Sequence, residues 1–151
     1  MANTQALCTS FKGELLTGTH NFGTGVTRAS TAADTFKAAL YLASATVNAS
    51  TTAYSSTGEV TGTNYTAGGA TVTNATAPAT NGTTAYWTPS ASITFSNVTL
   101  TTAFDAVLIY NSTQSNKAVS VHTFGSQTVT AGTFTLTMPT NDSSTGLIRL
   151  A

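Results

Sequence analysis

The chain has 151 residues, of which 40% are hydrophobic and only 7% are charged, and its five basic and five acidic residues leave no net charge. So few cations argue against nucleic-acid binding, because that affinity comes mainly from Lys and Arg that neutralise phosphates. The single cysteine, Cys8, excludes an internal disulfide, and no run of the sequence approaches the roughly 18 apolar residues of a membrane span.

Hydroxyl side chains take the place of charged ones. About 35 residues are Thr and about 15 are Ser. Thr is β-branched and suits a pleated, half-exposed surface, so the composition predicts one all-β domain. Little charge keeps copies of such a chain apart, and we expect it to hold a fixed place in an assembly. The predicted organisation is an N-terminal segment over residues 1–30, followed by a β-sandwich over residues 31–151.

The N-terminal segment contains one candidate helix. In residues 7–17, "LCTSFKGELLT", the side chains of Leu7, Phe11 and Leu15 recur at a four-residue spacing that favours a short helix. The first residues have no basic stretch and no long apolar run, which argues against a secretory signal. After a turn region, residues 34–44 alternate apolar and other side chains, so they predict a strand, with a short helix as the alternative.

Residues 51–89 are rich in Thr, Gly, Asn, Ala and Tyr and contain one acid, Glu59, and no base. Gly and Asn dipeptides mark turns throughout this stretch. Pro78 and Pro89 exclude central strands at their positions, and residues 75–84 are predicted to form an exposed loop. We therefore expect long loops and irregular edge structure on a sheet.

The C-terminal half shows the clearest strand patterns. The apolar positions change parity within residues 91–102, which predicts a bulge near Ser96–Asn97. Residues 104–111 are apolar on both faces except for Asp105, as in a central strand. The other predicted elements are a turn over 111–116, a returning hairpin strand over 117–124, a strictly alternating strand over 132–139 and a final strand over 144–151. Six to eight such strands predict a sandwich or jelly roll with one short N-terminal helix and long Gly/Asn/Thr-rich loops.

The sequence offers little for catalysis. His20 and His122 are far apart, and only Glu14 accompanies His20, so no metal site is expected. Cys8 lacks the spacing of a thiol nucleophile, and no G-x-S-x-G sequence occurs. The five acids leave open a glycosidase-like carboxylate pair, since any two could meet in a fold. We nevertheless expect no enzyme, no catalytic residue, no metal and no cofactor.

Four aromatic residues lie among the polar loops, where a sugar could stack on them. The alternative is that these rings cover a sheet edge or face a partner protein. The candidate interface or glycan-contact residues are Tyr54, Tyr65, Tyr86 and Trp87.

Residues 52–73, "TAYSSTGEVTGTNYTAGGATVT", resemble a segment of small structural proteins of tailed bacteriophages. In that segment a Tyr-rich lead runs into a T-G-E-V-x-G-x-x-Y-x-A-G-G pattern. The stretches "CTSFKGELLTGTHNF" and "TAFDAVLIYNST" are also similar to such proteins. The matching positions are Tyr54, Thr57, Gly58, Glu59, Val60, Gly62, Tyr65, Ala67, Gly68 and Gly69.

The resemblance implies a virion component made in the host cytoplasm, and it implies no catalytic residue. A protein beside packaged DNA would be expected to carry basic patches, which this chain lacks. We therefore expect a capsid decoration (cement) protein on the outer surface of the head. Its expected partners are the major capsid protein and copies of itself, with a trimer favoured by symmetry, and neither nucleic acid nor membrane. The alternatives are a tail, neck or baseplate protein, or a module that binds host glycans.

Overall fold

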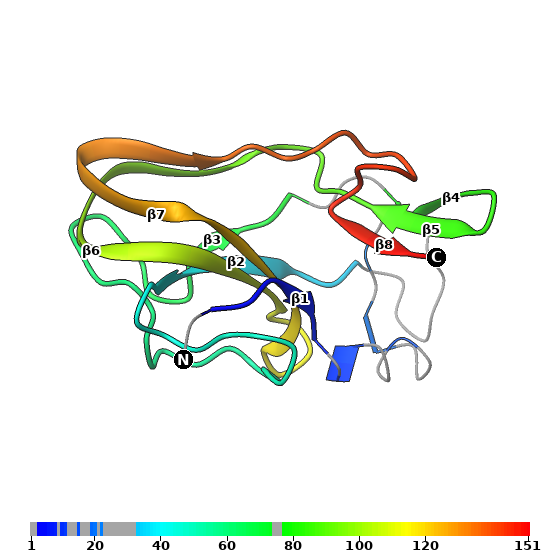
Figure 1. The fold of residues 1–151 in the computed structure, drawn as a ribbon, viewed down its shortest axis with the longest axis horizontal. Helices are drawn as coiled ribbons and strands as arrows, with labels where there is room; N and C mark the ends of the chain where they lie inside the picture. Colours follow the sequence, from blue (N-terminus) through cyan, green and yellow to red (C-terminus); the bar gives the residue numbers. More distant parts are fainter. Residues whose placement is uncertain are drawn as a thin grey trace.

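The computed structural model describes residues 3–8, 10–11, 15, 19–20, 22, 33–73 and 77–151. Within this part of the chain the protein is almost entirely β-structure, in two antiparallel sheets consistent with a β-sandwich (Figure 1). One sheet has five strands in the order β1-β7-β6-β2-β3, and the other has three in the order β4-β5-β8. The strands are β1 (Ala6–Leu7), β2 (Phe36–Leu42), β3 (Ala70–Thr71), β4 (Ala79–Asn81), β5 (Thr84–Trp87), β6 (Ile93–Asn111), β7 (Lys117–Leu136) and β8 (Ile148–Leu150).

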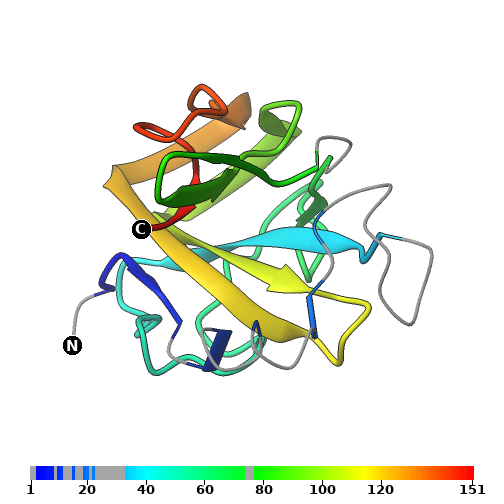
Figure 2. The ribbon, with the colours of Figure 1, turned by 90° about the vertical axis from the view of Figure 1, so that its right-hand side faces the viewer.

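A long bent hairpin of β6 and β7 organises the fold. The two strands pair antiparallel from Asn111 and Lys117 at the turn to Ile93 and Leu136 at the far end, with several register shifts between. The hairpin curls so that its far half, distant from the turn, lies over its near half, which is next to the turn (Figures 1 and 2). The ring of Phe134 lies 5.0 Å from that of Phe104 and thereby joins the two halves.

Several predicted elements are confirmed by this hairpin. The predicted bulge lies in the register shift between Phe95 and Val98, where Asn97 has a φ of 54°. The near half of β6 pairs with both β7 and β2, and its apolar residues are buried on both faces, as expected of a central strand. The predicted strands over 117–124 and 132–139 differ from the structure in two respects. They belong to a single strand, β7, which continues through Gly125, and this strand ends at Leu136 and not at residue 139.

One other expectation needs correction, and the predicted helix is not shown. Residues 75–84 were expected to form a loop, but β4 and β5 make a hairpin there, with Gly82 at a φ of 58° in its turn. The helix predicted over 7–17 is not shown, since most of its residues lie outside the described ones. Leu7 belongs to β1, which pairs with Ser120 of β7, so a helix does not begin at that residue.

The N-terminal segment is tied to the sandwich. The side-chain amide of Asn3 donates to the backbone oxygen of Leu42 and to Oδ1 of Asp105, and its oxygen accepts from Val47 N. Asn3 therefore attaches the start of the described chain to the same body as the remaining strands. None of the described segments is a helix long and apolar enough to cross a bilayer.

Candidate interaction surface

The segment that carries the bacteriophage resemblance is held by a buried carboxylate. Glu59 is 6% exposed. Its Oε2 accepts from the Tyr54 hydroxyl at 2.7 Å, and its Oε1 accepts from the Tyr65 hydroxyl and from Gly68 N, both at 2.8 Å. We call these four residues the Glu59 cluster. It fixes the loop between β2 and β3.

The hydroxyl groups of Tyr54 and Tyr65 are thus used inside the protein. Burial, reinforced by the hydrogen bond to Glu59, raises the pKa of both side chains well above the ordinary value. Both phenols therefore stay protonated and act as donors to the carboxylate. The Tyr54 ring also stacks on Tyr110, with centroids 4.8 Å apart. These contacts give the two tyrosines a structural role inside the protein, and their bond to Glu59 was not predicted from the sequence.

Trp87 does not fit the glycan-contact hypothesis. Its side chain is 2% exposed and packs against Phe22 and Phe36, with ring centroids 4.9 Å and 5.9 Å away. A sugar cannot stack on a buried indole, so that prediction is wrong for this residue. Tyr86 is half-buried and lines a small apolar pocket of about 120 Å³ together with Trp87 and Leu150. The four aromatic residues do not form one exposed platform.

The two histidines lie in separate environments. His20 is buried, and its Nδ1 lies 3.1 Å from Asn111 Nδ2, which also donates to Asp34 Oδ2 at 2.8 Å. His122 lies on β7, with Nε2 2.9 Å from the hydroxyl of Ser120. Within the described residues, no three side chains of His, Cys, Asp or Glu are grouped so as to hold a metal ion. Glu14, the proposed companion of His20, lies outside them.

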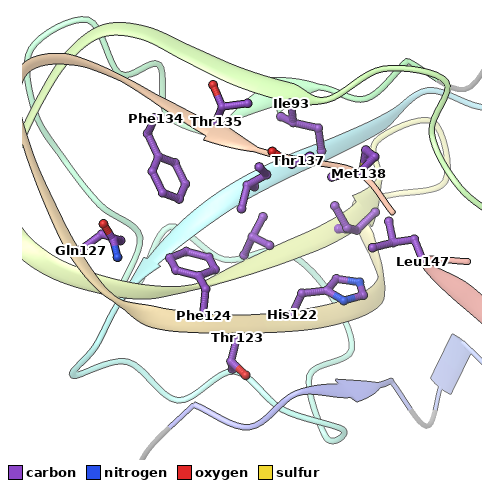
Figure 3. Close-up of a pocket in the computed structure, with 13 residues that line it drawn as sticks. Ile93, His122, Thr123, Phe124, Gln127, Phe134, Thr135, Thr137, Met138 and Leu147 are labelled. Atoms are coloured by element: carbon purple, nitrogen blue, oxygen red, sulfur yellow. The ribbon is translucent and has the colours of Figure 1, made fainter. Parts of the chain in front are cut away.

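His122 belongs to an apolar cleft of about 330 Å³ between the two halves of the bent hairpin. Figure 3 shows the rings of Phe124 and Phe134 pointing into this space, whereas Thr123 and Thr135 point away. The floor and walls come mainly from hydrophobic side chains of β6, β7 and the segment that follows β7. They include Ile93, Val107, Ile109, Phe124, Phe134, Leu136, Met138 and Leu147.

Burial in this cleft lowers the pKa of His122 from 6.5 to about 4. Between these two values the unfolded chain binds a proton that the folded protein does not. Folding stability from this residue is therefore fully present above pH 6.5 and is lost as the pH falls toward 4. Between pH 7.5 and pH 5 we expect a loss of about 2 kcal/mol from His122 alone.

Urea unfolding of the wild-type chain and of His122→Gln at the two pH values measures this loss. The variant should lose less stability on acidification, because it cannot bind the proton in either state. An equal loss in both proteins would contradict the assignment.

The two sides of the sandwich differ in how their strand edges are covered. On the β2 side, Leu42 N donates to Gly58 O, and Val60 N donates to Leu40 O. The same loop reaches the far half of β6, where Thr99 N donates to Thr63 O. The loop that contains the Glu59 cluster therefore covers the edge of β2 and the neighbouring edge of β6 in the far half of the hairpin.

The opposite side is formed by β7. Its first residues are covered, because Lys117 pairs with Ala53, Ala118 N donates to Thr52 O, and Cys8 N donates to Val119 O. β1 pairs with it only at Ser120 and Val121. Beyond Val121, no other described strand pairs with β7 on the side away from β6. From Gly125 to Met138 the chain has no charged residue, and the inward side chains Phe134 and Leu136 are half-buried. We call Gly132–Met138, which comprises the last five residues of β7 and the two residues that follow it, the open edge.

Strand edges of this kind usually carry protection. Charged residues, Pro or a covering segment normally prevent an edge from pairing with another chain. The open edge ends one residue before Pro139. It contains no charged residue and no Pro, and no segment among the described residues pairs with it on the side away from β6. It is the most suitable surface in the described part of the chain for binding another polypeptide.

Comparison with protein-family models, curated proteins and solved structures finds no match for this chain. The arguments on function therefore depend on the residues themselves.

The sequence contained a partial signal for the open edge. The alternation of Thr133, Thr135 and Thr137 with Phe134, Leu136 and Met138 predicted its inward and outward faces, and the structure has the Thr side chains exposed. Its position at the edge of a layer was not predictable, because strand order is set by contacts distant in sequence.

Proposed function

We propose that this chain is a structural component of a bacteriophage virion, and specifically a capsid decoration protein on the outer surface of the head. The observation that carries the proposal is the uncharged, uncovered edge of β7, which suits a protein that functions by binding its neighbours. The resemblance of residues 52–73 to bacteriophage structural proteins supplies the biological setting.

The proposed action is non-covalent bridging of capsid subunits. Each copy would contact the major capsid protein and other copies, and each standard interface buries about 1,600 Å². Many moderate contacts, repeated over a closed shell, together resist internal pressure although no single one is tight. The near absence of charge favours the outer surface over the DNA-lined interior.

A tail, neck or baseplate protein is the alternative within the same class. The geometry of the aromatic residues does not favour a glycan-binding module, since Trp87 is buried and the hydroxyl groups of Tyr54 and Tyr65 bind Glu59. The proposal includes no catalysis, no cofactor, no nucleic acid and no membrane.

The number of copies per particle tests the location. We expect quantitative mass spectrometry of purified virions to find this chain at a constant, high ratio to the major capsid protein. Neck and tail rings have small closed symmetries, so a count of about a dozen or fewer would place the chain there instead. Its absence from purified particles would contradict the whole proposal.

A further inference from the structure

The open edge of β7 is suited to pair with itself. Its seven residues alternate Thr with apolar side chains, and none carries a charge that would repel a second copy. In an extended strand they span about 23 Å, which is an ordinary length for a strand pairing. An antiparallel arrangement of two identical segments about a two-fold axis is self-complementary.

We propose that two copies of this chain associate edge to edge through Gly132–Met138, antiparallel and centred on Thr135. In this register Thr135 faces its own equivalent, and Thr133 faces Thr137 of the second copy. Cross-strand Thr pairs are favourable in antiparallel sheets. On the inner side, Phe134 faces Leu136 of the second copy, and Leu136 faces Phe134 of the second copy. Half-exposed apolar side chains beside the cleft therefore become covered.

The opposite side of the sandwich cannot form this contact, because the loop of the Glu59 cluster already occupies it. The far halves of the two hairpins would join into one sheet in the order β6-β7-β7-β6. An edge contact of this type is two-fold, so it predicts a dimer in place of the trimer expected from symmetry. The inference does not depend on where in a virion the protein lies.

The test uses charges at the centre of the proposed contact. Sedimentation velocity over a range of concentrations should show the wild-type chain as a dimer. T135K and T135E each place like charges opposite one another, and each should weaken the dimer at least about tenfold. An equimolar mixture of T135K and T135E should restore it, because the mixed pair has opposite charges.

T101K is the matched control, since Thr101 is exposed on the neighbouring strand β6 and lies outside the proposed contact. It should remain dimeric. Far-UV circular dichroism and thermal unfolding check that every variant is folded, and restoration in the mixture excludes misfolding as the cause of dissociation.

A cross-link gives an independent measurement. In the proposed register, T135C should form disulfide-linked dimers under mild oxidation, because directly opposed β-carbons lie within reach of a disulfide. T101C should not. The native Cys8 is buried and does not interfere.

The outcomes that overturn the proposal are distinct. They are a monomeric wild-type chain, an assembly other than a dimer, a dimer that T135K leaves unchanged, and a mixture of T135K and T135E that stays monomeric. A wild-type monomer that instead binds a strand of another virion protein would leave the proposed function intact while overturning this inference.

Discussion

Replacing Glu59 with Ala is expected to lower the free energy of unfolding by about 3 to 5 kcal/mol. The carboxylate accepts three hydrogen bonds, from Tyr54, Tyr65 and Gly68. Hydrogen bonds to a charged group contribute about 1.5 to 3 kcal/mol each, and a buried donor left without an acceptor costs about 1 to 3 kcal/mol. Water can reach the half-buried tyrosines, so the expected cost lies below the sum of these values.

The loss should also spread beyond the loop. The Tyr65 hydroxyl accepts from Leu40 N in β2 while it donates to Glu59, and the Tyr110 hydroxyl donates to Gly68 O. The carboxylate therefore links the loop to β2 and β6. In a domain of this size, 3 to 5 kcal/mol corresponds to a decrease in the melting temperature of about 10 to 15 °C.

Glu59→Gln is the matched variant for this prediction. Its amide oxygen can still accept hydrogen bonds, and the tyrosine hydroxyls can rotate to accept from the amide nitrogen, so a cost of about 1 to 2 kcal/mol is expected. Urea unfolding of the three proteins at pH 7.5 measures the difference. If Glu59→Ala were no less stable than Glu59→Gln, the carboxylate would not be the centre of the cluster.

The sequence predicted local strand patterns well, because they depend on alternation alone. β2 was recognised from the apolar parity of Phe36, Ala38 and Leu40, and the bulge of β6 from a change of parity near Asn97. The continuation of β7 was missed, since residues 125–128, "GSQT", have the composition of a turn. In the structure these residues belong to β7 and connect the near and far halves of the bent hairpin.

The aromatic residues show where composition misled. Tyr54, Tyr65 and Trp87 stand among polar residues in the sequence, which made them candidates for contact with a ligand. In the structure the first two bind Glu59, and Trp87 packs on Phe22 and Phe36. Each partner except Glu59 lies many residues away, and no periodicity connects them. The apolar cleft was missed for the same reason.

The positions that carry the bacteriophage resemblance are explained by the same loop. Glu59, Tyr65 and Gly68 form the hydrogen bonds of the cluster, while Gly62 and Gly69 allow the backbone to approach neighbouring strands closely. These residue types are therefore required for folding. In this chain the loop closes the β2 side of the sandwich, and among the described residues the open edge on the opposite side stays uncovered.

Replacing Gly69 with Ala is the second substitution for which we expect a large loss of stability. A β-carbon at this position would lie 1.8 Å from the backbone oxygen of Ala38 and 2.7 Å from Cα of Ala39, and the φ of Gly69 is +74°. Both neighbours belong to the backbone of β2, which is held by pairing with β6, so they cannot move aside. We expect Gly69→Ala to cost about 4 kcal/mol or more, combining a steric overlap with a left-handed backbone.

Substitutions at two further glycines separate the cost of steric overlap from the cost of the left-handed backbone. Gly82 has a φ of +58° with no atom within 4 Å of an added β-carbon, so Gly82→Ala should cost about 1 to 2 kcal/mol from backbone conformation alone. Gly125 has the same open space without a positive φ, and Gly125→Ala should change stability by less than about 0.5 kcal/mol. Urea unfolding should therefore give Gly69→Ala a far lower free energy of unfolding than Gly82→Ala, and Gly82→Ala a lower one than Gly125→Ala. Equal losses at Gly69 and Gly82 would show that the loop can withdraw from β2, and the β2 side could then no longer be regarded as closed.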